Sequence, residues 1–245
     1  MSSIEHLGQP RLFVSLFQSV VAPPLLTAFA PHRPRNGKKI GVFDIVKGLK
    51  EGYHLSTLLA YLLAFGGVGL LAQYRDMSLA DLARHNLIEH DASLFHVDAH
   101  NDDEYAPTPV NDSLVKVALN EGGRYRPGRM TLEDVANIRV KREAESRPLD
   151  GVHAEIARGE MAIAIGVLGG ENAMTEGLDM DVLRLWVEQE RLPDAWTPNH
   201  TQGLYKTYRM ATVIRERMKA MKEGRMHNIL DDESESQPEE SAKTK

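Results

Sequence analysis

The stretch that decides the fold class is residues 204–222, LYKTYRMATVIRERMKAMK. Its apolar side chains recur every three or four residues, a spacing that places them on one face of a helix. These side chains are Leu204, Tyr208, Ala211, Ile214, Met218 and Met221. A basic amphipathic helix of this kind can bind a membrane surface or calmodulin. We favour the alternative, a helix packed on the protein with a solvated basic face.

Similar spacing and cap signals predict helices along most of the chain. Thr131 is a good N-cap and Pro148 a stop signal for a helix over 132–145. No stretch shows a convincing strand pattern or an internal repeat, so we predict one all-α domain. The other expected helices are 12–21, 25–30, 42–51, 56–72, 79–86, 113–120, 153–168, one from 179 or 181 to 190, and 204–222.

The most apolar run, residues 55–72, is long enough to cross a bilayer. Gly66, Gly67 and Gly69 interrupt it, so we expect a buried helix and no stable membrane insertion. Residues 1–10 lack the basic start and long apolar core of a secretory signal. We therefore expect a cytoplasmic protein.

The composition excludes several classes of chemistry. The 245 residues include no cysteine, which rules out thiolate nucleophiles, disulfides and iron–sulfur clusters. The net charge is −6, and 231–245 hold six acidic residues against two lysines, so the body is nearly neutral and no nucleic-acid partner is expected. We divide the chain into a domain over 1–228 and a disordered acidic tail over 229–245.

The first candidate site is Glu89-His90-Asp91-Ala92-Ser93, which directly follows two apolar residues. Neighbouring carboxylates can tune the proton affinity of a histidine. Glu89, His90 and Ser93 also offer ligands to a hard cation. The structural alternative is a helix-to-loop junction whose polar groups satisfy backbone amides, and the segment alone favours it.

Two further patterns carry candidate chemistry. Glu160 begins the apolar stretch 161–168, and a positioned, buried glutamate can act as a general acid or base. Its alternative is a place on the solvated face of a helix, which is the commoner case. If extended, His96, Asp98 and His100 share one face and can ligate a non-haem metal, although such loose sets arise by chance in polar loops.

Four stretches in a shared order resemble the fungal chloroperoxidase and unspecific-peroxygenase family, the haem-thiolate peroxidases, over most of 21–198. Residues 22–25 and 35–38 (APPL and RNGK) resemble the family's Pro-Cys-Pro segment and the Asn-Gly turn after it. Residues 89–93 match its Glu-His-Asp-x-Ser motif, and 158–162 (RGEMA) resemble the segment bearing its distal glutamate. Residues 181–186 and 190–198 match its C-terminal signature.

This resemblance implies a single helical domain of chloroperoxidase type and a haem cofactor. The family's axial cysteine falls on Pro23, which has no donor atom, so haem-thiolate chemistry is excluded. The family's distal acid–base pair falls on His90 and Glu160. Its cation site, near a haem propionate, falls on Glu89 and Ser93, which implies magnesium or manganese there.

The function implied by the resemblance is a peroxidase or peroxygenase-type oxidoreductase. Its substrate would be a small apolar or aromatic molecule in fungal secondary metabolism. One alternative is a haem-free enzyme in which His90 and Glu160 catalyse cyclisation, dehydration or isomerisation in the former haem cavity. Another is a binding protein without catalysis. The sequence does not give the oligomeric state.

Overall fold

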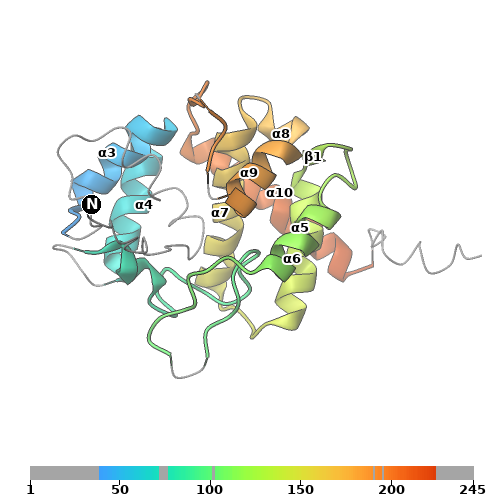
Figure 1. The fold of residues 1–245 in the computed structure, drawn as a ribbon, viewed down its shortest axis with the longest axis horizontal. Helices are drawn as coiled ribbons and strands as arrows, with labels where there is room; N and C mark the ends of the chain where they lie inside the picture. The colour runs from blue at the N-terminus through green and yellow to red at the C-terminus, as the bar shows by residue number, and fades with distance from the viewer. Residues whose placement is uncertain (1–38, 72–76, 101–102, 190, 195, 225–245) are drawn as a thin grey trace, which may run out of the picture.

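The computed structural model describes residues 39–71, 77–100, 103–189, 191–194 and 196–224 (Figure 1). Within these residues the chain is mostly helical, with one antiparallel pair of two-residue strands. This confirms the all-α prediction. Pro23, the helices expected over 12–21 and 25–30, and the acidic tail lie outside the described residues.

The observed helices follow the expected ones closely, with ends that shift by a few residues. The stretch expected as a helix over 79–86 forms a short 3-10 helix, and α8 and the strand pair were not expected from the sequence. The elements are α3 (Val42–Tyr53), α4 (Thr57–Leu70), η1 (Leu79–Ala83), α5 (Asp112–Glu121), β1 (Arg129–Met130), α6 (Leu132–Glu145), α7 (Gly151–Gly169), α8 (Ala173–Glu176), β2 (Leu178–Asp179), α9 (Met180–Gln189) and α10 (Leu204–Lys222).

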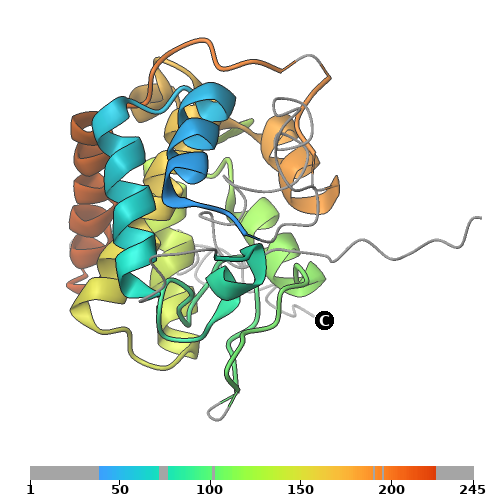
Figure 2. The same cartoon turned by 90° about the vertical axis from the view of Figure 1, so that its left-hand side faces the viewer.

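Helix α7 lies at the centre of the described fold, between the α3–α4 pair and the helices α5, α6, α9 and α10 (Figures 1 and 2). Its buried side chains divide between two apolar clusters. Ile163 and Val167 pack with α3 and α4, whereas Met161 and Ile165 pack with the other group. A residue in the middle of α7, such as Glu160, is therefore carried by the most enclosed element.

Side-chain caps fix where the central helices begin. Asp134 accepts hydrogen bonds from the backbone N–H of Thr131 at 2.8 Å and from its hydroxyl at 2.7 Å, while the Thr131 hydroxyl accepts from the Asp134 N–H at 3.1 Å. This reciprocal cap starts α6 where the sequence predicted. Asp150 caps α7 by accepting from the N–H groups of Val152 and His153.

Helix α10 packs against α6 and α7 through Ala211, Ile214 and Met218, as expected of a packed amphipathic helix. Tyr208, which was expected on the same face, is instead 60% exposed. Several of its basic side chains make ion pairs with these neighbours. Arg215 pairs with Glu155 at 3.1 Å, Arg217 with Glu133 at 3.2 Å and Lys222 with Glu143 at 3.0 Å.

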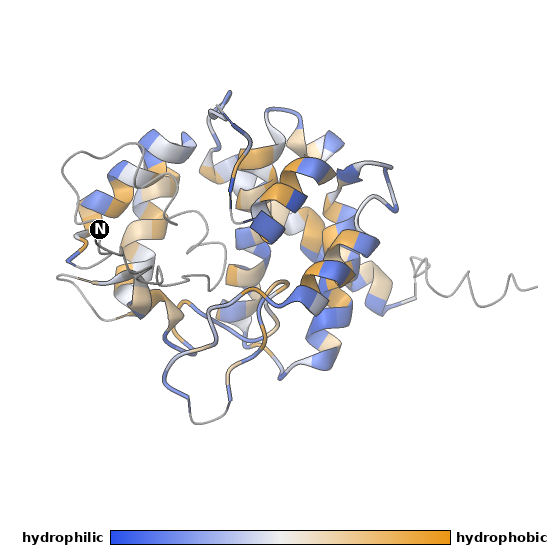
Figure 3. Cartoon of the chain, in the orientation of Figure 1, coloured by the Kyte–Doolittle hydropathy of each residue, from blue (hydrophilic) through white to orange (hydrophobic). Residues whose placement is uncertain are grey.

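Helix α4 corrects the expectation of a buried helix. Ala60 and Ala64 are fully buried, but Leu58, Leu62 and Phe65 are 64%, 54% and 48% exposed. Among the described residues, the buried side chains of α4 pack into one apolar cluster with α3 and α7, whereas the hydropathy colouring shows few hydrophilic positions along α4 (Figure 3). No helix among the described residues is both long and apolar enough to span a membrane.

Candidate functional site

The structure brings His90 and Glu160 together, although 70 residues separate them in the sequence. The His90 Nε2 and Glu160 Oε2 atoms lie 3.4 Å apart, and the two side chains are 2% and 13% exposed. Neither His90 Nε2 nor Glu160 Oε1 has a hydrogen-bond partner among the described residues. Buried polar atoms are nearly always paired, so these two are available to a third group.

The other ring nitrogen of His90 fixes the orientation of the imidazole. His90 Nδ1 lies 2.7 Å from the backbone oxygen of Asp91. Because a carbonyl oxygen only accepts, Nδ1 carries the proton and donates it. In the neutral ring, Nε2 therefore presents a lone pair toward Glu160, and in the protonated ring it presents an N–H.

Several groups act on the pKa of His90. Burial lowers it, but the Glu160 carboxylate and the Asp91 carbonyl outweigh burial, so the pKa lies above its ordinary value. Arg139 of α6 opposes this rise. The Arg139 side chain is 1% exposed and bonds Glu143 at 3.1 Å, whereas its Nε has no partner. The net result is an imidazole that holds its proton more strongly than a free histidine.

Two arginines at the end of α6 hold the loop that carries His90. Arg147 makes two bonds with the Asp91 carboxylate, at 2.7 and 2.8 Å. Arg142 donates to the Ser93 backbone oxygen at 2.9 Å and to the Asp98 carboxylate at 2.5 Å. Within this loop Ala92 has a φ of 60°, a left-handed conformation that is uncommon outside glycine. The Ala92 N–H donates to Asp98 at 2.8 Å, which stabilises the bend. Neither arginine was predicted from the sequence to contact this loop.

Glu89 and Ser93, the expected cation ligands, are each engaged with a histidine. Glu89 Oε2 lies 2.7 Å from His85 Nδ1, and Ser93 Oγ lies 3.2 Å from His96 Nδ1. Burial raises the pKa of Glu89, while His85 and His90 oppose the rise. No cluster of three metal-type side chains occurs in the described part of the chain. The magnesium or manganese site at Glu89 and Ser93 stays a prediction.

The segment from His96 to His100 serves the loop. The Asp98 carboxylate is neutralised by Arg142 at 2.5 Å. His96 is buried, and burial lowers its pKa to about 4, whereas His100 is exposed. These different surroundings favour the structural interpretation of this triplet over a metal site.

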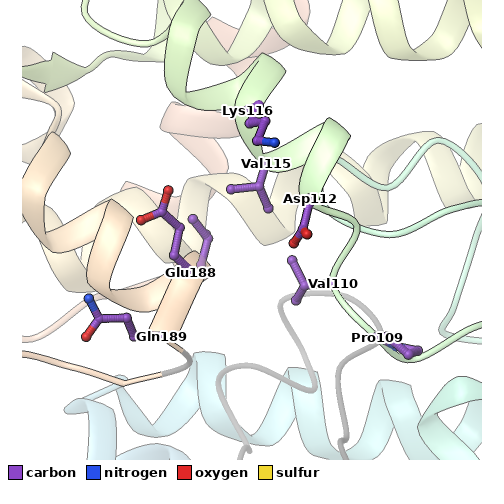
Figure 4. A pocket seen from close by; sticks show the side chains of 8 residues that line it. Pro109, Val110, Asp112, Val115, Lys116, Glu188 and Gln189 are labelled. Carbon is purple, nitrogen blue, oxygen red and sulfur yellow. The ribbon is translucent and has the colours of Figure 1, made fainter.

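A separate pocket of about 440 Å³ lies between α5 and α9 (Figure 4). Val115 and Val187 line it together with the polar side chains of Asp112, Lys116 and Glu188. Neither His90 nor Glu160 is among its lining residues, so the acid–base pair does not belong to this pocket.

Comparison with models of known protein families gives the class of this protein. The chain matches the family described as "Peroxidase, family 2", the chloroperoxidase family, over residues 24–201. The match covers well over half of the chain, so the protein belongs to this peroxidase family. A search among curated proteins finds no match.

A thiolate-held haem, the group that the family implies, does not fit this chain. The sequence contains no cysteine, and Pro23 precedes the first matched residue. Among the described residues, His90 Nδ1 and both ring nitrogens of His153 lie against protein groups at 2.7 to 3.3 Å, and His90 Nε2 faces Glu160 Oε2 at 3.4 Å. The structure places His90 and Glu160 next to each other, and their role as the family's distal couple stays a prediction.

Proposed function

We propose that this protein is a peroxidase-family enzyme that transfers protons through His90 and Glu160, without a thiolate-held haem. Its substrate is a small apolar or aromatic molecule, and its reaction is a cyclisation, dehydration or isomerisation. The observation that carries the proposal is the 3.4 Å approach of His90 Nε2 and Glu160 Oε2 with unpartnered polar atoms on both side chains. The context, fungal secondary metabolism, follows from the family resemblance.

The chemistry needs one group to give a proton and one to take it. The pKa of His90 lies above its ordinary value because of the Glu160 carboxylate and the Asp91 carbonyl, so the ring keeps its proton to higher pH than a free histidine and can donate it from Nε2. The Glu160 carboxylate, at 13% side-chain exposure, is the base beside it and is more accessible than the imidazole. General acid–base catalysis of this kind typically accelerates a reaction by about 10²- to 10⁴-fold.

The second candidate function is a haem-dependent oxidoreductase, and the family match over residues 24–201 favours it. When bound, haem supplies the peroxide chemistry of this family. The axial ligand would then be a residue other than cysteine, because the chain has none. In this case His90 and Glu160 would move the proton that accompanies O–O cleavage.

The test combines a spectrum with a substrate screen. Purified protein is supplemented with haem and its absorption recorded, and colourless protein is then incubated with small aromatic and apolar compounds that are analysed by mass spectrometry. We expect no Soret band and turnover that Glu160→Gln and His90→Ala abolish. Glu155→Gln, on the same helix and 52% exposed, is the matched control that keeps activity.

Other outcomes would overturn the proposal in distinct ways. A Soret band that persists through gel filtration would favour the oxidoreductase. Full activity in both site variants would remove the acid–base assignment. Binding of a compound without turnover would leave a non-catalytic binding protein.

A further inference from the structure

We propose that Arg147 is a positioning residue for His90 and that it fixes, through Asp91, which ring nitrogen carries the proton. The catalytic consequence of this inference rests on the proposed function, whereas the geometry does not. Arg147 lies just beyond α6, 57 residues from His90 in the sequence.

The contacts form a short chain of hydrogen bonds. Arg147 Nε lies 2.7 Å from Asp91 Oδ2, and its Nη2 lies 2.8 Å from Asp91 Oδ1. This two-point grip on a side chain that is 8% exposed holds residue 91 in place. The backbone oxygen of the same residue accepts the Nδ1–H of His90 at 2.7 Å. A shift of Asp91 would therefore move the acceptor that orients the imidazole.

Arg147 also contacts two other residues, Ala99 in the same loop and His85 before the motif. Its Nη2 donates to the Ala99 backbone oxygen at 2.6 Å and lies 3.4 Å from His85 Nε2. Because a carboxylate only accepts, His85 Nδ1–H donates to Glu89, and in the neutral ring His85 Nε2 then carries the lone pair that faces Arg147 in this long contact. Arg147 thus contacts both the residue that orients His90 and the ring of His85, which precedes the motif.

The geometry requires an arginine at this position. The planar guanidinium matches the two oxygens of a carboxylate and has donors left for the Ala99 carbonyl. A lysine supplies the charge as a single point and cannot make the two parallel bonds. If Arg147 served only as a surface cation, lysine would replace it without consequence for His90.

The consequence for the reaction concerns the tautomer. Free imidazole favours the Nε2–H form, in which Nε2 cannot accept a proton. The Asp91 carbonyl selects the opposite form and leaves the Nε2 lone pair facing Glu160. Loss of the two bonds to the Asp91 carboxylate is therefore expected to return His90 toward the ordinary tautomer mixture.

The test is ¹⁵N NMR of histidine-labelled protein, with His90 assigned by comparison with His90→Ala. Wild-type protein is expected to show the Nδ1–H tautomer at high pH. In Arg147→Met and Arg147→Lys, the two nitrogen signals at high pH are expected to move toward those of free histidine. Added guanidinium ion is expected to reverse part of the shift in Arg147→Met.

Arg124→Met is the matched control, because Arg124 grips the carboxylate of Glu121 at 3.1 Å in another part of the fold. It is expected to leave the His90 signals unchanged. Unchanged His90 signals in folded Arg147→Lys would overturn the inference, and this variant serves if Arg147→Met does not fold. The readout needs no turnover, so a tautomer shift in a protein without activity would refute only the proposed function.

Discussion

Two histidine–carboxylate pairs lie next to each other in this protein, and they differ in sequence separation, in distance and in the partners of their polar atoms. His85 and Glu89 are four residues apart, 5% and 3% exposed, and joined at 2.7 Å. His90 and Glu160 come from separate elements, approach only to 3.4 Å and leave buried atoms unpartnered. Arg147 adds a donor at 3.4 Å to His85 Nε2, so both ring nitrogens of His85 lie against protein groups.

The difference separates a structural pair from a reactive one. In His85 and Glu89, the closed pair, the polar groups bond each other and stabilise the conformation of the loop. In the open pair, His90 and Glu160, an imidazole nitrogen and a carboxylate oxygen have no hydrogen-bond partner among the described residues and are the atoms that a bound molecule would meet. Both pairs use the same residue types, so geometry and not composition distinguishes their roles.

The largest expected effect of a single change is on turnover by Glu160→Gln. The amide cannot take up a proton, so we expect the rate to fall by about 10²- to 10⁴-fold. The measurement is the turnover number on any substrate that the screen identifies, at matched folded concentration. A fall of less than about 10-fold would exclude Glu160 as the base.

Removing one partner of the closed pair is expected to lower the free energy of unfolding. His85→Leu leaves the Glu89 carboxylate buried without its 2.7 Å partner. Breaking a buried pair in this way costs about 3–5 kcal/mol, measurable as a shift in urea unfolding. The folded fraction is expected to retain activity; if it is inactive at unchanged stability, the roles of the two pairs are reversed.

A third imidazole in the loop, His96, predicts the response to acid. Its pKa is lowered to about 4, so the native state holds it neutral, whereas the unfolded chain takes up a proton below about pH 6.5. The contribution of His96 to the free energy of unfolding is therefore full above pH 6.5 and is lost between pH 6.5 and 4, by on the order of 3 kcal/mol. Unfolding of His96→Leu is expected to vary less with pH over this range, and an equal slope would refute the assignment.

The contribution of His90 to the free energy of unfolding is expected to depend on pH in the opposite direction. Because its folded pKa is raised, its contribution to stability is full below the ordinary value of 6.5 and is lost as the pH rises through the folded pKa. The two histidines can therefore be separated in one pH series of unfolding experiments with wild type, His96→Leu and His90→Ala.

The smallest expected effect is that of Glu160→Gln on stability. Glu160 Oε2 approaches His90 Nε2 only to 3.4 Å and Glu160 Oε1 has no partner among the described residues, so the interaction lost is weaker than that of the 2.7 Å pair. We expect the free energy of unfolding to change by less than about 1 kcal/mol. A loss as large as that of His85→Leu would show that the open pair is structural as well.

Local signals in the sequence predicted the helices well and the loop contacts poorly. Thr131 and the apolar period of 204–222 gave the bounds of α6 and α10, because caps and periodicity act within a few residues. The exposed face of α4 was missed because its hydrophobicity is nearly uniform around the helix, so the sequence does not show which side has neighbours.

The site was predicted in part. His90 and Glu160 were identified through the family resemblance, and the structure places them in contact. Arg142 and Arg147 were missed because each reaches the loop across about 50 residues of sequence, and their pairing depends on how the loop folds. His85 was missed because it precedes the motif and reaches Glu89 only through the local turn.

The most direct measurement is the titration of His90 by ¹⁵N NMR in wild type and in Glu160→Gln. If the two side chains form one acid–base couple, the wild-type pKa lies above 6.5 and falls when the carboxylate becomes an amide. The same midpoint in both proteins would mean that Glu160 does not act on His90, and the proton-transfer function would then have no basis in this structure.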